Sequence, residues 1–283
     1  MGMAMLYRTE EKTIQVFGSP MTYVSFGRGE KPLVLIPGLS LKSIHGSGPA
    51  LAWMYRIFKG EYHVYVFDRK EVLPVPCTVS ALADDVAEAM RQLEITKADV
   101  IGISQGGMIA QYLALHYPEL VRKLVLGVTL SRTNDTLRTV IDCWVEMAEK
   151  KDYEAIVQSM LENLYSEQYV RKYGWIFPIA MKTAKLYDPE RFIHLAKACL
   201  TCDTYEHLKE IRCPVLVLGG KEDKIVTARA SEEIAERLSC PIYIYDGLGH
   251  SAYEEGKDFN QRIYDFLKTE DKGSESKCQP RSI

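Results

Sequence analysis

Short runs of β-branched and aliphatic residues alternate with longer amphipathic stretches along most of this 283-residue chain. Six runs predict buried strands, at positions 33–36, 64–67, 99–103, 123–128, 214–219 and 241–246. Apolar residues at helical spacing predict helices between them, at 79–93, 106–117, 230–238 and 259–267. Such alternation is typical of a mostly parallel sheet covered by helices on both faces. The predicted fold class is therefore α/β, and residues 14–17 and 22–25, joined by Gly18-Ser19-Pro20, predict a hairpin ahead of it.

The alternation stops between residues 131 and 205, where no strand signal appears. Helices are predicted there at 133–150, 153–164, 166–173 and 189–200. We therefore predict an α/β core formed by residues 1–130 and 206–267, interrupted by an all-helical cap at 131–205. The polar stretch 268–283, which is rich in Gly, Ser and Lys, predicts a disordered tail.

Aromatic residues are dense in the predicted cap. Ordinary packing explains most such residues, but a helical lid over a ligand pocket also needs an apolar underside. As candidate pocket residues we select Trp144, Tyr165, Tyr169 and Trp175.

Charge and cysteine usage exclude several classes of protein. The net charge is −3 and no basic block is present, which argues against a nucleic-acid partner. The most apolar runs have the length of strands, well short of the roughly 20 residues that span a bilayer, so no membrane association is expected. The odd number of cysteines, seven, and the charged residues that follow the first Met indicate a cytoplasmic protein with reduced thiols. The sequence does not address the oligomeric state.

A metal site is the alternative interpretation of one cysteine pair. Cys199 and Cys202 are separated by two residues, with His194 and His207 nearby. Zinc sites of this kind need a second ligand pair at matching spacing, and the chain has no second closely spaced cysteine pair. We therefore predict no metal.

The segment Gly102-Ile103-Ser104-Gln105-Gly106-Gly107 lies between a predicted strand and a predicted helix. This G-x-S-x-G pattern in a strand-turn-helix context is the nucleophile elbow, a strained turn that exposes the serine hydroxyl and requires small flanking residues. The Gln105 N–H would lie at the amino terminus of the helix, where unpaired amides favour an oxyanion. Ser104 is thus the candidate nucleophile.

A serine nucleophile needs a general base and a carboxylate that orients it. Asp223 and His250 each follow a late predicted strand, and the carboxyl ends of parallel strands meet at one edge of the sheet. Both side chains are therefore expected beside Ser104. The rival acid, Glu222, is one residue too early and would point elsewhere.

These motifs make the chain resemble the α/β-hydrolases, in the capped serine-hydrolase branch of haloperoxidase-like enzymes, enol-lactone hydrolases and meta-cleavage-product hydrolases. The resemblance also includes LVLIPGLS, YPELVRKLVL and CPVLVLGGKED, and it extends from the hairpin to Leu267. By position, it implies that the Leu39 N–H is the second oxyanion donor beside Gln105. Many relatives have a glycine-rich turn where this chain has Asp68-Arg69-Lys70-Glu71, so the entrance is expected to differ.

The predicted function is hydrolysis of a small carboxylic ester, lactone or related acyl compound through an acyl-enzyme, with no cofactor. The alternatives are carbon-carbon bond hydrolysis of the meta-cleavage type and cofactor-free perhydrolysis, which the resemblance implies for the same residues. From a different class, a non-catalytic ligand-binding member of the fold also stays open. The partner in each case is a small molecule.

Overall fold

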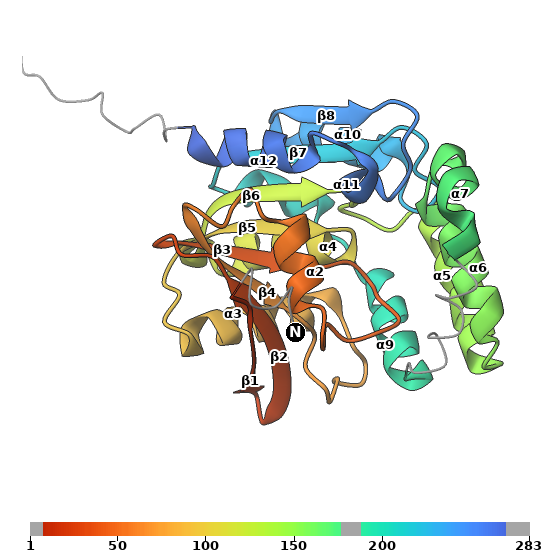
Figure 1. Ribbon diagram of the computed structural model, residues 1–283, viewed down its shortest axis with the longest axis horizontal. Helices are drawn as coiled ribbons and strands as arrows, with labels where there is room; N and C mark the ends of the chain where they lie inside the picture. Colours follow the sequence, from red (N-terminus) through yellow and green to blue (C-terminus); the bar gives the residue numbers. More distant parts are fainter. Residues whose placement is uncertain (1–7, 177–187, 270–283) are drawn as a thin grey trace, which may run out of the picture.

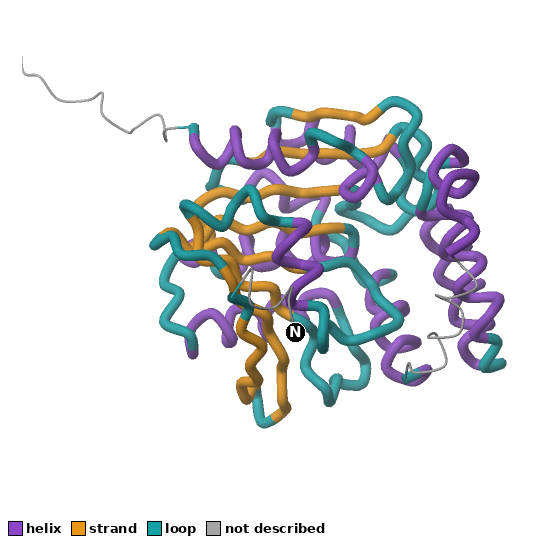
Figure 2. Tube along the Cα trace, in the orientation of Figure 1, coloured by secondary structure: helices purple, strands orange, loops and turns teal. Residues whose placement is uncertain are grey.

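An eight-stranded sheet runs through the centre of the computed structural model, which describes residues 8–176 and 188–269 (Figure 1). In sheet order, its strands are β1 (Glu10–Val16), β2 (Ser19–Phe26), β4 (Tyr62–Phe67), β3 (Lys31–Ile36), β5 (Ala98–Ile103), β6 (Val121–Gly127), β7 (Val215–Gly220) and β8 (Ile242–Tyr245). Among these described strands, β2 alone runs against its neighbours, and the pairs from β4 to β8 are parallel. The predicted mostly parallel α/β fold is confirmed (Figure 2).

The first two strands form the predicted hairpin, but its turn is shorter than expected. Phe17 and Gly18 alone make the turn, with φ angles of 47° and 77°. Ser19 and Pro20, which were expected in the turn, pair with Val16 and Gln15 in the ladder. A two-residue turn with two positive φ values matches the right-handed twist of the flanking strands, which explains why the strands continue up to it.

Helices cover both faces of the sheet, as predicted. The helices of the core are α2 (Gly48–Met54), α3 (Val79–Gln92), α4 (Gln105–His116), α10 (Ala228–Leu238), α11 (Ala252–Glu255) and α12 (Phe259–Lys268), with 3-10 turns η1 (Pro118–Leu120) and η3 (Tyr205–Glu210). Side chains of α3, α4 and α10 belong to one buried cluster, and those of α2, α11 and α12 to the other. The central strand β5 is buried at every position, because both of its faces are covered.

Between β6 and β7, the described part of residues 135–199 consists of helices and the short turns that join them. Its elements are α5 (Asp135–Glu149), α6 (Tyr153–Leu164), α7 (Glu167–Tyr173), the 3-10 turn η2 (Gly174–Ile176) and α9 (Pro189–Cys199). A polar side chain caps each of the four α-helices, as with Asn134, which accepts a hydrogen bond from the Leu137 N–H at 2.8 Å. We call residues 135–199 the helical insertion. It lies beside the carboxyl ends of the parallel strands (Figure 1).

The insertion leaves the core and returns to it at one place. An antiparallel bridge joins Arg132 to Asp203, and the Thr204 N–H donates to the Ser131 carbonyl oxygen at 2.7 Å. The two ends of the insertion are therefore joined to each other where the chain leaves and re-enters the core.

The end of the core differs slightly from the prediction. Helix α12 includes Lys268, which was expected in the tail, and Thr269 follows it as the last described residue. The rest of the predicted tail, residues 270–283, lies outside the described residues. Among the helices that the structure describes, none has the length and apolar character needed to cross a membrane.

Candidate active site

Ser104 occupies a sharp turn between β5 and α4. Its backbone angles are φ 54° and ψ −120°, a conformation that non-glycine residues rarely adopt. A Cβ atom on Gly106 would lie 1.9 Å from the carbonyl oxygen of Ile36, so only glycine fits there. The turn is fixed by hydrogen bonds from the Ser104 N–H to the Gly127 carbonyl oxygen at 2.8 Å and from the Thr129 hydroxyl to the Ser104 carbonyl oxygen at 2.8 Å. The strained geometry expected of a nucleophile elbow is thus present.

The structure brings His250 between Ser104 and Asp223. His250 Nε2 lies 2.8 Å from Ser104 Oγ, and His250 Nδ1 lies 2.8 Å from Asp223 Oδ2. A carboxylate can only accept, so the Nδ1–H donates to Asp223 and Nε2 is left to accept from the serine hydroxyl. The three side chains thus form the hydrogen-bonded chain that a serine nucleophile needs.

Asp223 is held as a carboxylate. Burial acts to raise the pKa of this carboxyl, but the charge and hydrogen bond of His250 and the N–H groups of Val226 and Ile225 outweigh burial, so the pKa is lowered below its ordinary value. The two N–H groups donate to Oδ1 at 2.9 Å and 2.8 Å, which leaves Oδ2 for the imidazole. The neighbouring Glu222 is exposed.

The two expected oxyanion donors lie on segments that flank Ser104. A Cβ on Gly38 would lie 3.2 Å from the Ser104 Cβ, so the loop after β3 contacts the nucleophile. Leu39 lines the same cavity as Ser104, and Gln105 is the first residue of α4. Within the described residues, neither the Leu39 N–H nor the Gln105 N–H donates to another backbone group. The first turn of a helix leaves such donors available to a developing anion.

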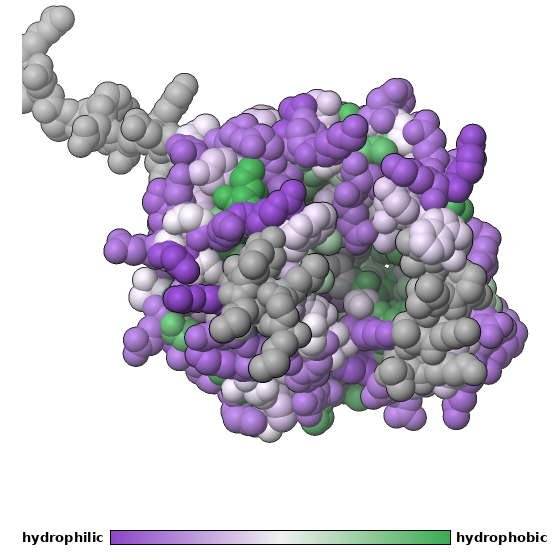
Figure 3. Space-filling view, viewed as in Figure 1, coloured by the Kyte–Doolittle hydropathy of each residue, from purple (hydrophilic) through white to green (hydrophobic). Residues whose placement is uncertain are grey.

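A cavity of about 60 Å³ lies at Ser104 between the core and the helical insertion. Its described lining residues are Gly38, Leu39, Ser104, Met108, Leu137, Ile141, Trp144, Met160, Leu164, Cys199, Ile225, His250 and Tyr253. Apart from the reacting groups, this wall is largely apolar. Figure 3 shows hydrophobic side chains deep in the hollow between the core and the insertion.

Of the four aromatic residues predicted to line the pocket, Trp144 alone is among the described lining residues. It is 4% exposed, and its Nε1–H donates to the Ser159 hydroxyl at 3.0 Å. Tyr165 instead donates its hydroxyl proton to Glu254 at 2.7 Å and stacks on Tyr169 at a ring-centroid distance of 4.5 Å. Trp175 is 73% exposed. Tyr165, Tyr169 and Trp175 are therefore placed away from the described wall of this cavity, because the two tyrosines pack on each other, Tyr165 contacts α11, and Trp175 faces solvent.

Sequence reasoning missed most of the apolar wall. Leu137 and Ile141 precede Trp144 on α5 at positions i, i+4 and i+7, which is the spacing of one helix face. That periodicity is visible in the sequence and marks the buried face of α5. Selecting residues by aromatic character alone overlooked it.

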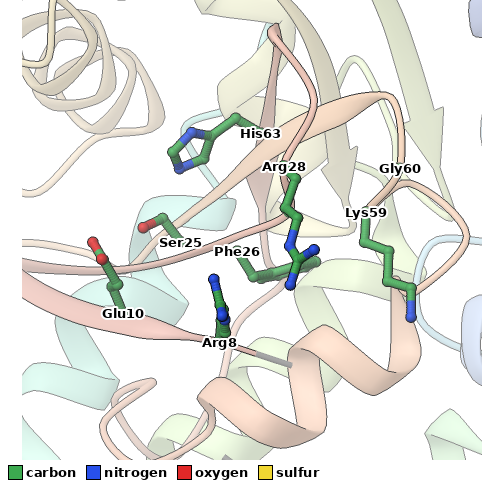
Figure 4. Close-up of a pocket in the computed structure, with 9 residues that line it drawn as sticks. Arg8, Glu10, Ser25, Phe26, Arg28, Lys59, Gly60 and His63 are labelled. Atoms are coloured by element: carbon green, nitrogen blue, oxygen red, sulfur yellow. The ribbon is translucent and has the colours of Figure 1, made fainter. Parts of the chain in front are cut away.

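A second cavity is larger but lies elsewhere. Its volume is about 610 Å³, and it is lined by Arg8, Glu10, Ser25, Phe26, Gly27, Arg28, Lys59, Gly60 and His63 (Figure 4). His63 is at the start of β4, so this cavity lies at the amino-terminal edge of the parallel strands, opposite Ser104. The hydrogen-bonded Ser104, His250 and Asp223 identify the candidate active site better than cavity size does.

The cysteines near the cavity are not arranged as metal ligands. Burial raises the pKa of the Cys199 thiol to about 12, and this thiol accepts a hydrogen bond from Gln105 Nε2 at 3.1 Å. In the described part of the chain, no three His, Cys, Asp or Glu side chains are grouped to hold a metal ion.

Comparison with known protein families shows the family to which this chain belongs. The family model described as alpha/beta hydrolase fold matches residues 31–257. The chain therefore belongs to the α/β-hydrolase fold family, as its fold and its serine turn indicate.

Among curated proteins, it is 26% identical over 248 residues to a putative carbamate hydrolase, RutD, of Rhizobium rhizogenes, covering 84% of this chain and 93% of the relative. It is 21% identical over 260 residues to 3-oxoadipate enol-lactonase 2 of Acinetobacter baylyi, covering 88% and 93%. Among solved structures, the enol-lactonase of Burkholderia xenovorans superposes with a TM-score of 0.80 at 20% identity, covering 91% of this chain and 100% of the other. The names of these three relatives all describe hydrolases.

Proposed function

We propose that this protein is a serine hydrolase that cleaves a small ester, lactone or related acyl compound through an acyl-enzyme on Ser104. The single observation that supports it most is the continuous hydrogen-bonded chain from Ser104 through His250 to Asp223, at 2.8 Å for each link. The residues proposed for catalysis come from three separate strand ends, which a packing role would not require.

The proposed reaction starts when Ser104 Oγ attacks the carbonyl carbon and its proton passes to His250 Nε2. Asp223 stabilises the imidazolium that forms, and the N–H groups of Leu39 and Gln105 bind the oxyanion. His250 then donates the proton to the leaving group, which departs and leaves the acyl group on Ser104. A water molecule, activated by His250, hydrolyses this ester and restores the serine. No cofactor takes part in these steps.

The wall of the cavity supports an acyl substrate. The cavity lies directly at Ser104, and its described lining is largely apolar apart from the reacting groups, which suits an apolar acyl group next to the carbonyl that Ser104 attacks. The names of the relatives, a carbamate hydrolase and an enol-lactonase, agree with acyl chemistry.

The experiment is a turnover screen with the purified protein over short p-nitrophenyl esters, small lactones, an aryl carbamate and a vinylogous diketone acid. We expect hydrolysis of at least one short acyl substrate, and at least a roughly thousandfold lower kcat for Ser104→Ala, because covalent catalysis goes with the hydroxyl. Ser80→Ala, the same change in α3, is the control. No turnover by the wild type, or full turnover by Ser104→Ala, would contradict the proposal and favour a non-catalytic binding protein.

A further inference from the structure

A buried arginine joins the two segments that carry the proposed oxyanion donors. Arg69 follows the end of β4 by two residues and is 6% exposed. Its Nη2 donates to the Pro37 carbonyl oxygen at 2.7 Å and to the Gln105 side-chain Oε1 at 3.2 Å. Pro37 leads into Gly38 and Leu39, while Gln105 begins α4. One guanidinium nitrogen therefore contacts both segments.

The Gln105 side chain is fixed at its other end too. Its Nε2 donates to the Leu195 carbonyl oxygen at 2.6 Å and to Cys199 Sγ at 3.1 Å, and the residue is 1% exposed. Every polar atom of this buried amide thus has a partner. Leaving such an atom unsatisfied is costly, so the side chain is held in one conformation, and with it the start of α4.

The backbone of Arg69 is also held. Its N–H donates to Asp68 Oδ1 at 2.7 Å, and its carbonyl oxygen accepts from Arg191 Nη2 of helix α9 at 2.7 Å. Asp68 Oδ2 accepts from the Ile44 N–H at 3.0 Å, and Arg191 lies 3.5 Å from Asp68. Burial lowers the pKa of Arg69 to about 10, which leaves the guanidinium charged at neutral pH. Arg69 is therefore a charged side chain that is held in place through both its backbone and its guanidinium group.

We propose that Arg69 is a positioning residue that sets the spacing between the Leu39 and Gln105 N–H groups, through Pro37 and the Gln105 side chain. Arg69 is not among the described residues that line the Ser104 cavity, so it acts through these two segments. An oxyanion hole works only when its donors are about 2.7–3.1 Å from the developing oxygen, and a small misplacement weakens it. This inference rests on the proposed function.

The test uses Arg69→Met and Gln105→Met. The first removes the guanidinium, and the second removes its acceptor while keeping the backbone N–H of residue 105. For each variant, kcat on the best short ester should fall roughly tenfold to a hundredfold, part of the 10²–10³ that follows loss of a whole donor, while KM stays nearly constant. Affinity for an arylboronic acid, which forms a tetrahedral adduct on the serine, should fall in the same proportion, and affinity for the carboxylic acid product should not change.

Two further variants separate positioning from general damage to the loop. Lys70 and Asp85 form a neighbouring buried ion pair at 2.8 Å that contacts neither oxyanion segment in the described structure. The double change Lys70→Gln/Asp85→Asn should therefore keep kcat and boronate affinity near wild type. Arg69→Lys, which keeps the charge, should recover part of the loss. The double variant Arg69→Met/Gln105→Met should lose less than the product of the two single losses, because the two changes share the connection between Arg69 and Gln105.

The outcomes separate this inference from the proposed function. If folded Arg69→Met and Gln105→Met keep the wild-type kcat and boronate affinity, the positioning role of Arg69 is overturned and the serine mechanism is left intact. An equal loss of kcat and boronate affinity in the Lys70→Gln/Asp85→Asn control would overturn the positioning role as well. If Arg69→Met does not fold, Gln105→Met decides by the same two readouts. A wild-type protein that hydrolyses no acyl substrate would overturn the proposed function first, and this inference with it.

Discussion

Replacement of Trp144 by alanine should change which acyl chains the protein accepts. Trp144 is 4% exposed and lies in the wall of the cavity of about 60 Å³ beside Ser104. In the wild type, an acyl chain that reaches Trp144 must displace this wall, and each methylene beyond that point should cost about 1–3 kcal/mol of transition-state binding. Removing the indole opens the cavity, so the cost of the first excess methylenes should disappear.

The magnitude follows from the number of methylenes accommodated. Relief of a single methylene corresponds to a tenfold to roughly 200-fold change in selectivity. We therefore expect Trp144→Ala to lower the ratio of kcat/KM for acetyl over hexanoyl esters by at least about tenfold. The same change should lower the free energy of unfolding by about 3–5 kcal/mol, since it empties a buried site.

The assay is kcat/KM for p-nitrophenyl esters from acetyl to octanoyl, with urea unfolding measured in parallel. Trp175→Ala is the matched control, because it makes the same chemical change at a residue that is 73% exposed. The control should keep the wild-type chain-length profile and change stability by less than about 0.5 kcal/mol. An unchanged acetyl-to-hexanoyl ratio in folded Trp144→Ala would refute the assignment of this wall to the acyl group.

Other predictions concern the acid and the serine turn. Asp223→Asn should lower kcat by about 10⁴ through loss of the correct imidazole tautomer, whereas the exposed Glu222→Gln should change it less than about twofold; comparable losses would show that the wrong carboxylate was chosen. Because the pKa of Asp223 is below its ordinary value of 3.8, its contribution to stability is present above that pH and is lost as pH falls through the folded pKa. Urea unfolding between pH 5 and 2 should therefore show the wild-type advantage over Asp223→Asn shrinking with acid, and a pH-independent difference would oppose this. Gly106→Ala, whose Cβ would lie 1.9 Å from a backbone oxygen, should lower the thermal midpoint by several degrees and reduce turnover, while Gly60→Ala, which meets nothing within 4 Å, should do neither.

Much of the core was predictable because its signals are local. Each parallel strand is a short apolar run, and the glycines beside Ser104 are required by the turn itself, so both can be found without tertiary information. The convergence of Asp223 and His250 on Ser104 follows from one topological rule, that the carboxyl ends of parallel strands share an edge. The sequence predicts that the three side chains lie close together, but it does not predict the distances between their atoms.

The pocket wall was less predictable, since composition does not specify which face of a helix is covered. Tyr165, Tyr169 and Trp175 are as aromatic as Trp144, yet only the contacts of α6, α7 and α11 determine where they point. Periodicity on α5 would have been the better guide.

The buried contacts of Arg69 could not be predicted from the sequence for a different reason. Its partners Gln105 and Arg191 are 36 and 122 positions away in the chain, and no motif relates them. A buried charge with distant partners is visible only once the fold is known.

Mass spectrometry of the protein after treatment with a fluorophosphonate, with peptide mapping of the adduct, tests directly whether Ser104 is the nucleophile. The proposed mechanism predicts a single adduct on Ser104, formed at a rate that falls sharply in Asp223→Asn and absent in Ser104→Ala. Ser80→Ala should label like the wild type. No adduct on the wild type, or an adduct on a different serine that persists in Ser104→Ala, would contradict the assignment of Ser104 as the nucleophile.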